Sequence, residues 1–207
     1  MELLLIRHAL PVRREASDGP ADPELSEVGH AQAKHLAAYL SSEAVDAVYS
    51  SPLRRARQTA EPLAEAFGRE VVVEPDVAEL DRDASEYIPV EELRDANDPR
   101  WQAMVDGSWM LQHEAPELFS ARVIDAVERI ISAHAGERVA VVCHGGVIGR
   151  YTAHVLELPG DRAGFFYPNY TSIHRIAASR NGPRSIVTLN ETAHLRGTGL
   201  PMGLFQS

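Results

Sequence analysis

Short apolar runs alternate with amphipathic segments along the chain, and this alternation predicts β-strands joined by α-helices. The runs are shorter than ordinary helices and are bounded by Gly, Pro or polar residues, which is typical of buried strands. They occupy residues 3–6, 45–49, 71–73, 138–143, 171–178 and 185–189. The last two flank an Asn-Gly-Pro sequence at residues 181–183, which predicts a turn and a hairpin.

Amphipathic helices are predicted over residues 26–41, 52–67, 118–135 and 145–156. Ser26 favours an N-cap of the first helix. Ser51 and Pro52 favour the N-cap and first position of the second helix, and Gly68 favours its end. A strand, a helix and a strand in this order predict a parallel, right-handed crossover. We therefore expect an α/β fold with a mostly parallel sheet, in which residues 1–207 form one domain.

Two less regular segments lie between these elements. Residues 9–24 contain three Pro and one Gly, which predicts a long irregular loop over a pocket. Residues 84–118 combine Pro, scattered acids and both Trp101 and Trp109, which predicts a helical insertion across the pocket. The two tryptophans form either a small satellite core or a substrate lid.

Polar side chains follow three of the predicted strands at the point where each strand ends. Arg7 and His8 follow the first strand, Arg54 and Arg55 lie just after the second, and His144 follows the strand at 138–143. The carboxyl ends of parallel strands meet at one edge of a sheet, where open α/β folds bind ligands. The two arginines of the second group also fall in the first helical turn, where free backbone N–H groups favour a phosphate.

The charge balance narrows the class of ligand. The formal net charge of −10 argues against a nucleic-acid or anionic-membrane surface. Six of the 20 Lys and Arg residues nevertheless follow just two strand ends, which predicts a cationic pocket for a small anion. These six are Arg7, Arg13, Arg14, Arg54, Arg55 and Arg57.

The compartment is predicted from what the chain lacks. A single cysteine, Cys143, excludes an internal disulfide and a multi-cysteine metal site. No apolar run approaches the length of a membrane span, and Arg7 and His8 interrupt the first run too early for a signal peptide. We therefore expect a cytoplasmic protein with no membrane partner.

Six tracts together resemble the histidine phosphatase superfamily, in its phosphoglycerate-mutase-like branch. They are Leu-Ile-Arg-His-Ala (5–9), Leu-Ser-Glu-Val-Gly-His-Ala-Gln-Ala (25–33), Ser-Ser-Pro-Leu-Arg-Arg-Ala-Arg-Gln-Thr-Ala (50–60), Val-Cys-His-Gly-Gly (142–146), Asn-Tyr-Thr-Ser-Ile (169–173) and Leu-Asn-Glu-Thr-Ala-His-Leu (189–195). They span nearly the whole chain. The resemblance implies a three-layer α/β/α sandwich with a helical insertion over the active site.

The resemblance also implies roles for individual residues. His8 attacks phosphorus and carries the phosphoryl group, while the phosphate oxygens are held by Arg7, Arg55, His144 and Gly145. Glu79 protonates the leaving oxygen. The segment after Glu79 matches the family less well, because Arg-Asp-Ala-Ser at residues 82–85 replaces a glycine-containing stretch. Asp81 and Asp83 therefore stand as alternative proton donors.

These roles predict a phosphomonoester hydrolase that acts on a small phosphorylated metabolite through a phosphohistidine, without a metal or other cofactor. A cofactor-dependent phosphoglycerate mutase and an inactive phospho-ligand binding module are the alternatives. A cysteine-dependent phosphatase is disfavoured because Cys143 and Arg150 are separated by one residue too many for that motif. The oligomeric state is open, with a homodimer among the alternatives.

Overall fold

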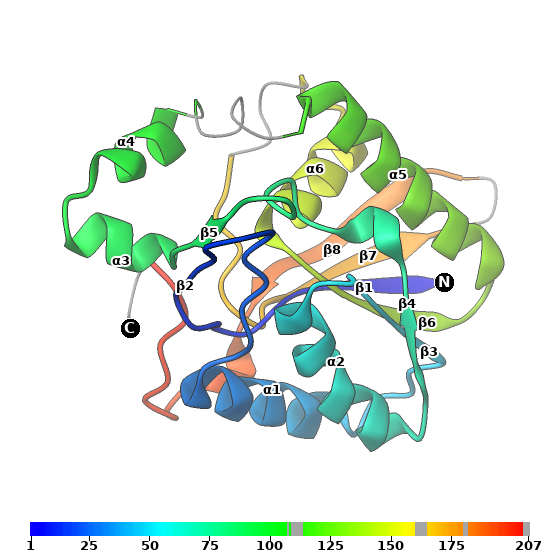
Figure 1. Cartoon of the computed structure of the whole chain (residues 1–207). Coiled ribbons are helices and arrows are strands. Elements are labelled where there is room, and N and C mark those ends of the chain that lie inside the picture. The colour runs from blue at the N-terminus through cyan, green and yellow to red at the C-terminus, as the bar shows by residue number, and fades with distance from the viewer. Residues whose placement is uncertain (107, 109–113, 160–164, 180–181, 205–207) are drawn as a thin grey trace.

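The computed structural model describes residues 1–106, 108, 114–159, 165–179 and 182–204. A six-stranded sheet with the order β4-β3-β6-β1-β7-β8 forms its centre (Figure 1). The strands are β1 (Glu2–Arg7), β3 (Ala47–Ser50), β4 (Val71–Val73), β6 (Arg138–Cys143), β7 (Ile173–Ala178) and β8 (Arg184–Glu191). The first four are mutually parallel, and β7 and β8 are antiparallel additions. The mostly parallel sheet and the antiparallel pair at its end are confirmed, although Asn181 of the predicted turn lies outside the described residues.

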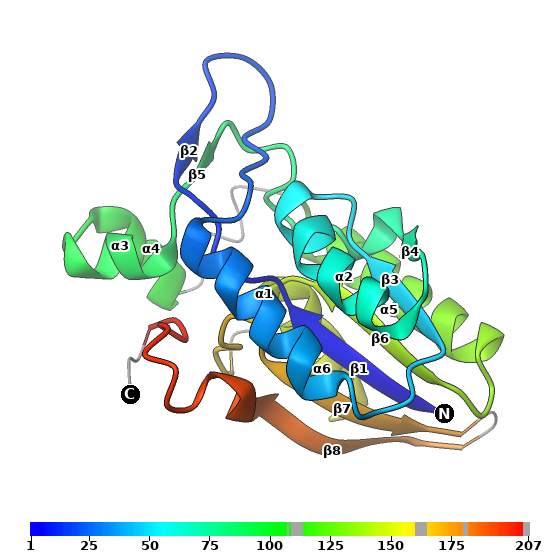
Figure 2. The ribbon, with the colours of Figure 1, turned by 90° about the horizontal axis from the view of Figure 1, so that it is seen from below.

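Helices cover both faces of the sheet, which confirms the three-layer sandwich. Figure 2 shows α1 (Glu27–Leu40) and α2 (Arg54–Phe67) on one face, with α5 (Pro116–Ala133) and α6 (Gly145–Val155) on the other. Alternate residues of β1 point to opposite faces of the sheet. Leu3 and Leu5 pack in the core under α5 and α6, and Leu4 and Ile6 pack in the core under α1 and α2. A strand buried on both faces explains the continuous apolar run.

The insertion carries α3 (Val90–Asp95) and α4 (Pro99–Asp106), which extend beyond the sandwich at its left in Figure 1. Two short strands, β2 (Arg14–Glu15) and β5 (Glu86–Tyr87), pair antiparallel and join the loop at 9–24 to the insertion. The prediction that residues 9–24 are wholly irregular is therefore wrong. That residues 1–207 form one domain stays a prediction.

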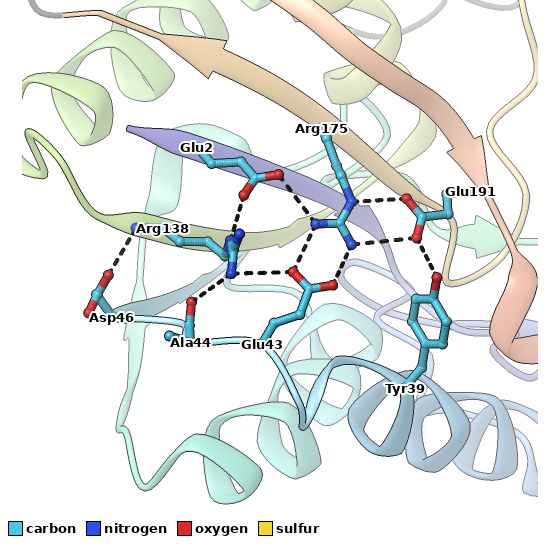
Figure 3. Close-up of polar contacts among 8 residues, drawn as sticks. All are labelled: Glu2, Tyr39, Glu43, Ala44, Asp46, Arg138, Arg175 and Glu191. Carbon is cyan, nitrogen blue, oxygen red and sulfur yellow. Dashed lines mark hydrogen bonds and ion pairs between the residues drawn. The ribbon is translucent and has the colours of Figure 1, made fainter.

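An ion-pair network ties four elements together on the α1 side of the sheet (Figure 3). Arg175 on β7 lies 2.7 Å from Glu43, 2.9 Å from Glu191 and 3.3 Å from Glu2. Arg138 at the start of β6 pairs with the same Glu2 and Glu43. The network joins β1, β6, β7 and β8 to the segment after α1.

No helix in the described part of the chain is long and apolar enough to cross a membrane.

Candidate active site

The imidazole of His8 is fixed directly after β1. Its backbone N–H donates to the carbonyl of Cys143 at 2.9 Å, and its ring Nδ1 lies 2.8 Å from the carbonyl oxygen of Ala9. A carbonyl oxygen only accepts, so Nδ1 carries the proton and the Nε2 lone pair is left free. The ring is buried, with 3% of the residue exposed. His8 therefore presents an oriented nucleophilic nitrogen.

His144 lies beside His8 because β6 is the parallel neighbour of β1, with Arg7 opposite Cys143. The two imidazole centroids are 5.1 Å apart. The Nε2 atom of His144 lies 2.7 Å from the Oγ atom of Ser51, at the end of the adjacent strand β3. Its Nδ1 atom is buried and has no hydrogen-bond partner among the described residues.

Arg7 and Arg55 bring two buried guanidinium groups to the same edge, and aromatic rings hold both. Arg7 donates from Nη1 to the carbonyl of Pro168 at 2.6 Å, and its Cζ atom lies 4.2 Å from the ring centroid of Tyr170. The Cζ atom of Arg55 lies 4.6 Å from the ring centroid of Tyr87. The Nε atoms of both arginines lack hydrogen-bond partners in the described part of the chain. Such donors suit an anion with several oxygens.

The charges of the site keep both imidazoles neutral. Burial, with Arg55 and then Arg7 nearby, lowers the pKa of His8 well below its usual value. Burial lowers the pKa of His144 in the same way, and among the neighbouring charges Arg55 has the largest effect. A neutral imidazole is the nucleophilic form, so His8 is in the reactive state across the neutral pH range.

Backbone groups hold Glu79 at the site. The N–H of Gly146 donates to Oε2 at 2.8 Å, and the N–H of Leu80 donates to Oε1 at 3.0 Å. A Cβ atom at position 146 would lie 2.3 Å from the Glu79 Oε1 atom, so a larger residue there displaces the carboxyl. Burial, followed by the nearby charge of Asp81, raises the pKa of Glu79. A carboxyl whose pKa is raised stays protonated to a higher pH, and the protonated carboxyl can donate a proton.

The two alternative proton donors are placed differently. Asp81 lies 3.3 Å from Arg55 and lines the cavity. The side chain of Asp83 is 86% exposed and pairs with Arg82, away from the cavity. Glu79 and Asp81 therefore lie at the site, whereas Asp83 lies away from it.

These groups line one cavity of about 420 Å³. Arg7, His8, Arg55, Glu79 and Gly145 all contribute to its wall, whereas His144 lies behind His8. All the residues predicted for the site are thus brought together. Trp101 also lines the cavity, as a lid residue does, while Trp109 lies outside the described residues.

The predicted cationic pocket is smaller than the sequence indicates. Arg13 pairs with Glu15, and both Arg14 and Arg54 pair with Glu24 on the surface. Arg57 is exposed as well. Of the six clustered cations, Arg7 and Arg55 line the cavity, whereas Arg13, Arg14 and Arg54 pair with surface carboxylates and Arg57 is exposed.

The start of α2 also differs from the prediction. The helix begins at Arg54 with Leu53 as N-cap, rather than at Pro52 with Ser51 as N-cap. Asp22 of the loop at 9–24 accepts from the N–H of Arg54 at 2.9 Å and supplies the cap from a distance. The Oγ atom of Ser51 accepts from the N–H of Leu53 at 3.3 Å and also lies 2.7 Å from the Nε2 atom of His144.

Sequence reasoning missed the aromatic supports of the arginines. Tyr167 and Tyr170 stack on Arg7, and Tyr87 stacks on Arg55. Tyr170 falls in a family-like tract, which was a usable signal. Tyr87 lies in the insertion, whose pattern carried none.

Comparison with known proteins decides the family. The model of the histidine phosphatase superfamily (branch 1) matches residues 3–192. The chain belongs to the histidine phosphatase superfamily. The predicted family, the histidine phosphatase superfamily, is confirmed. The predicted enzyme class, a phosphatase, is confirmed as well.

Curated relatives carry two kinds of name. Phosphoserine phosphatase 1 of Hydrogenobacter thermophilus is 35% identical over 70% of this chain and 71% of that protein. The metal-independent phosphoserine phosphatase of Arabidopsis thaliana is 34% identical over 71% of this chain and 65% of that protein. A probable phosphoglycerate mutase GpmB of Photorhabdus laumondii is 28% identical over 77% of this chain and 76% of that protein.

Solved structures share the fold. A phosphoserine phosphatase mutant from Entamoeba histolytica, in complex with phosphoserine, matches with a TM-score of 0.73 at 24% identity. The match covers 94% of this chain and 98% of that one. The likeness confirms the α/β/α architecture.

Proposed function

We propose that this histidine phosphatase-superfamily member hydrolyses small phosphomonoesters through a phosphohistidine on His8, without a metal. The observation that carries the proposal is the free Nε2 atom of a buried, neutral His8 beside two guanidinium groups with unpaired donors. In the described part of the chain, no three His, Cys, Asp or Glu side chains are grouped to hold a metal ion. The name of the Arabidopsis relative supports a metal-independent reaction.

In the first step, the Nε2 lone pair of His8 attacks phosphorus and the bond from phosphorus to the ester oxygen breaks. Glu79 gives its proton to the departing oxygen, so the alcohol leaves neutral. Phosphorylation places a positive charge on the imidazole, and the hydrogen bond from Nδ1 to the carbonyl of Ala9 stabilises it. Arg7 and Arg55 bind the phosphoryl oxygens, whose negative charge is spread in the transition state.

In the second step, Glu79 takes a proton from water while the water oxygen attacks phosphorus. The bond from phosphorus to Nε2 breaks, inorganic phosphate leaves and His8 is restored. The same carboxyl thus serves as acid and then as base. Burial and Asp81 raise the pKa of Glu79 while burial and the arginines lower the pKa of His8. The two opposite shifts let neutral His8 and protonated Glu79 coexist.

A mutase is the competing function, because relatives named probable phosphoglycerate mutases also match. A mutase returns the phosphoryl group to an acceptor instead of passing it to water. Release of inorganic phosphate, measured together with conversion of 3-phosphoglycerate in the presence of 2,3-bisphosphoglycerate, separates the two functions. We expect phosphate release without isomerisation.

The proposal is tested by trapping the intermediate. An alkaline denaturing quench within the first turnover, followed by digestion and mass spectrometry at alkaline pH, is expected to map an acid-labile, base-stable phosphoryl group to His8. His8→Asn is expected to lose the adduct and turnover, while His134→Asn, at a half-buried histidine away from the cavity, keeps both. Wild-type turnover in His8→Asn, or an adduct on another residue, contradicts the proposed mechanism. An inactive phospho-ligand binding module would bind phosphate without any turnover.

Two further properties stay proposals of the same account. The enzyme acts in the cytoplasm, and its partner is a small phosphorylated substrate rather than a nucleic acid. The oligomeric state is open, with a homodimer among the alternatives, and sedimentation analysis measures it.

A further inference from the structure

Beyond the phosphate site, the cavity has an apolar and aromatic wall. The segment around β5, the helices α3 and α4, and residue 166 supply it. Its larger members are Tyr87, Ile88, Leu93, Trp101, Met104 and Phe166. A cavity of about 420 Å³ has room for a leaving group as well as the phosphate.

The cations that line the cavity either lie at the phosphate site or pair with carboxylates of the protein. Arg7 and Arg55 lie at the phosphate site. Arg100 is the third cation that lines the cavity within the described residues, and carboxylates occupy its guanidinium. Asp98 lies 2.7 Å from its Nη2 atom, and both oxygens of Glu86 lie 2.9 Å from Nη1. No guanidinium in the described wall is left to pair with a carboxylate on the substrate.

The acidic side chains of the wall also disfavour a leaving group that carries a carboxylate. Asp81 and Glu86 line the cavity as well. A leaving group that carries a carboxylate would exchange its hydration for an apolar wall with like charges nearby, which is unfavourable. 3-Phosphoglycerate carries such a group, whereas phosphoserine carries an ammonium beside its carboxylate.

We infer that the cavity selects phosphomonoesters whose leaving group is uncharged and apolar, such as aryl or arylalkyl phosphates. The inference rests on the proposed function and specifies the substrate class of the same site. The wall supplies the binding free energy by removing apolar surface from water, and the acids reject anionic leaving groups. Selection is thus set by the insertion, while the phosphate site is common to all substrates.

A matched set of esters separates leaving-group recognition from chemistry. 2-Phenylethyl phosphate and 2-(4-carboxyphenyl)ethyl phosphate have nearly the same leaving alkoxide and differ in one remote carboxylate. Ethyl phosphate lacks the ring. We expect kcat/KM for the phenylethyl ester to exceed that of the other two by about ten- to a hundredfold, the range that a few apolar contacts supply.

Two variants test the wall itself. Trp101→Ala is expected to lower kcat/KM for the phenylethyl ester by about tenfold and to leave the ethyl ester within about twofold. Equal losses on both esters, or no loss on either, contradict the role of the wall. Glu86→Gln is expected to narrow the gap between the carboxylated and plain phenylethyl esters, because it removes a negative charge and releases one side of Arg100. An unchanged gap contradicts the role of charge.

The outcomes also separate this inference from the proposed function. If all esters are hydrolysed but the carboxylated ester or phosphoserine is preferred, the inference fails and the phosphatase stands. If no ester is hydrolysed although phosphate binds, the proposed function fails and the inference with it.

Discussion

Arg175 and Arg7 are both largely buried, yet their surroundings are opposite. Arg175, 12% exposed, pairs with Glu2, Glu43 and Glu191 at the ion-pair network of Figure 3. Arg7, 7% exposed, has no carboxylate partner in the described part of the chain and is held by the carbonyl of Pro168 and two tyrosine rings. One cation is neutralised by the protein, and the other is left for a ligand.

The difference separates arginines that stabilise the fold from arginines that act on a substrate. A buried charge is costly unless it is paired, so an unpaired one lowers stability and is retained only for function. Arg55 is intermediate, because Asp81 lies 3.3 Å from it. The aromatic rings hold the pocket cations in place while adding no formal charge that would compete with phosphate.

Replacing Arg7 tests the functional side of this comparison and is expected to have the largest effect. Arg7→Met removes preorganised charge stabilisation, so we expect kcat/KM to fall by about a hundred- to a thousandfold. The free energy of unfolding is expected to change by less than about 1 kcal/mol, because the lost stacking offsets the removed desolvation cost. Steady-state kinetics and urea denaturation of the same preparation check both values. Loss of stability that matches the loss of activity contradicts the functional role.

Arg175→Met is the matched test on the structural side. It leaves Glu2, Glu43 and Glu191 without their shared cation, so we expect the free energy of unfolding to fall by about 2–3 kcal/mol. This is below the roughly 3–5 kcal/mol of fully buried pairs, because solvent reaches part of the network. The kcat/KM of the folded protein is expected to stay within about twofold. A hundredfold loss of activity would contradict the division between the two regions.

Gly146→Ala tests which carboxyl donates the proton, Glu79 or Asp81. Glu79 pairs with no arginine in the described part of the chain and is held by the N–H groups of Gly146 and Leu80, so its position depends on the absence of a side chain at 146. A Cβ atom at 146 displaces the carboxyl, and we expect hydrolysis of an alkyl phosphate to fall by about ten- to a hundredfold. The phosphorylation burst with nitrophenyl phosphate, whose leaving group needs little protonation, is expected to fall much less. Equal losses contradict proton donation by Glu79 and favour Asp81, which Asp81→Asn then tests.

The pH profile reports the opposite shifts of His8 and Glu79. As pH falls through the lowered pKa of His8, the nucleophile becomes protonated and the rate drops. As pH rises through the raised pKa of Glu79, the acid is lost and the rate for an alkyl phosphate drops again. We expect a bell-shaped profile of kcat/KM whose acid limb lies well below the usual pKa of histidine. An acid limb at the usual value contradicts the burial of a neutral His8.

Arg54→Met is expected to have the smallest effect. Arg54 neighbours Arg55 in the chain but is exposed and pairs with Glu24. Surface pairs contribute little, so we expect both activity and stability to stay within about twofold and about 0.5 kcal/mol. A large loss of activity would place Arg54 in the pocket.

Much of the fold could be predicted because apolar periodicity determines it. β1 and β6 are buried on both faces, so each gave a continuous apolar run that ended at His8 or His144. The parallel register then brings the ends together. β2 and β5 could not be predicted, because each has only two residues and Tyr87 is the one residue of the four that is not exposed, so they carry no apolar pattern.

The composition of the site was predictable only in part. Strand ends indicated His8, Arg7, Arg55 and His144. Whether an arginine faces the cavity or the surface depends on distant carboxylates such as Glu24 and on rings such as Tyr87. Neither is near the arginines in sequence, so local spacing could not distinguish Arg54 from the functional cations.

Calorimetric titration with inorganic phosphate tests the central claim most directly, since it measures whether the pocket cations are free for a dianion. The wild-type protein and Arg175→Met are expected to bind phosphate with the same affinity, and Arg7→Met is expected to show no measurable binding. Phosphate binding that survives in Arg7→Met, or that is lost in Arg175→Met, would contradict the assignment of the two arginines.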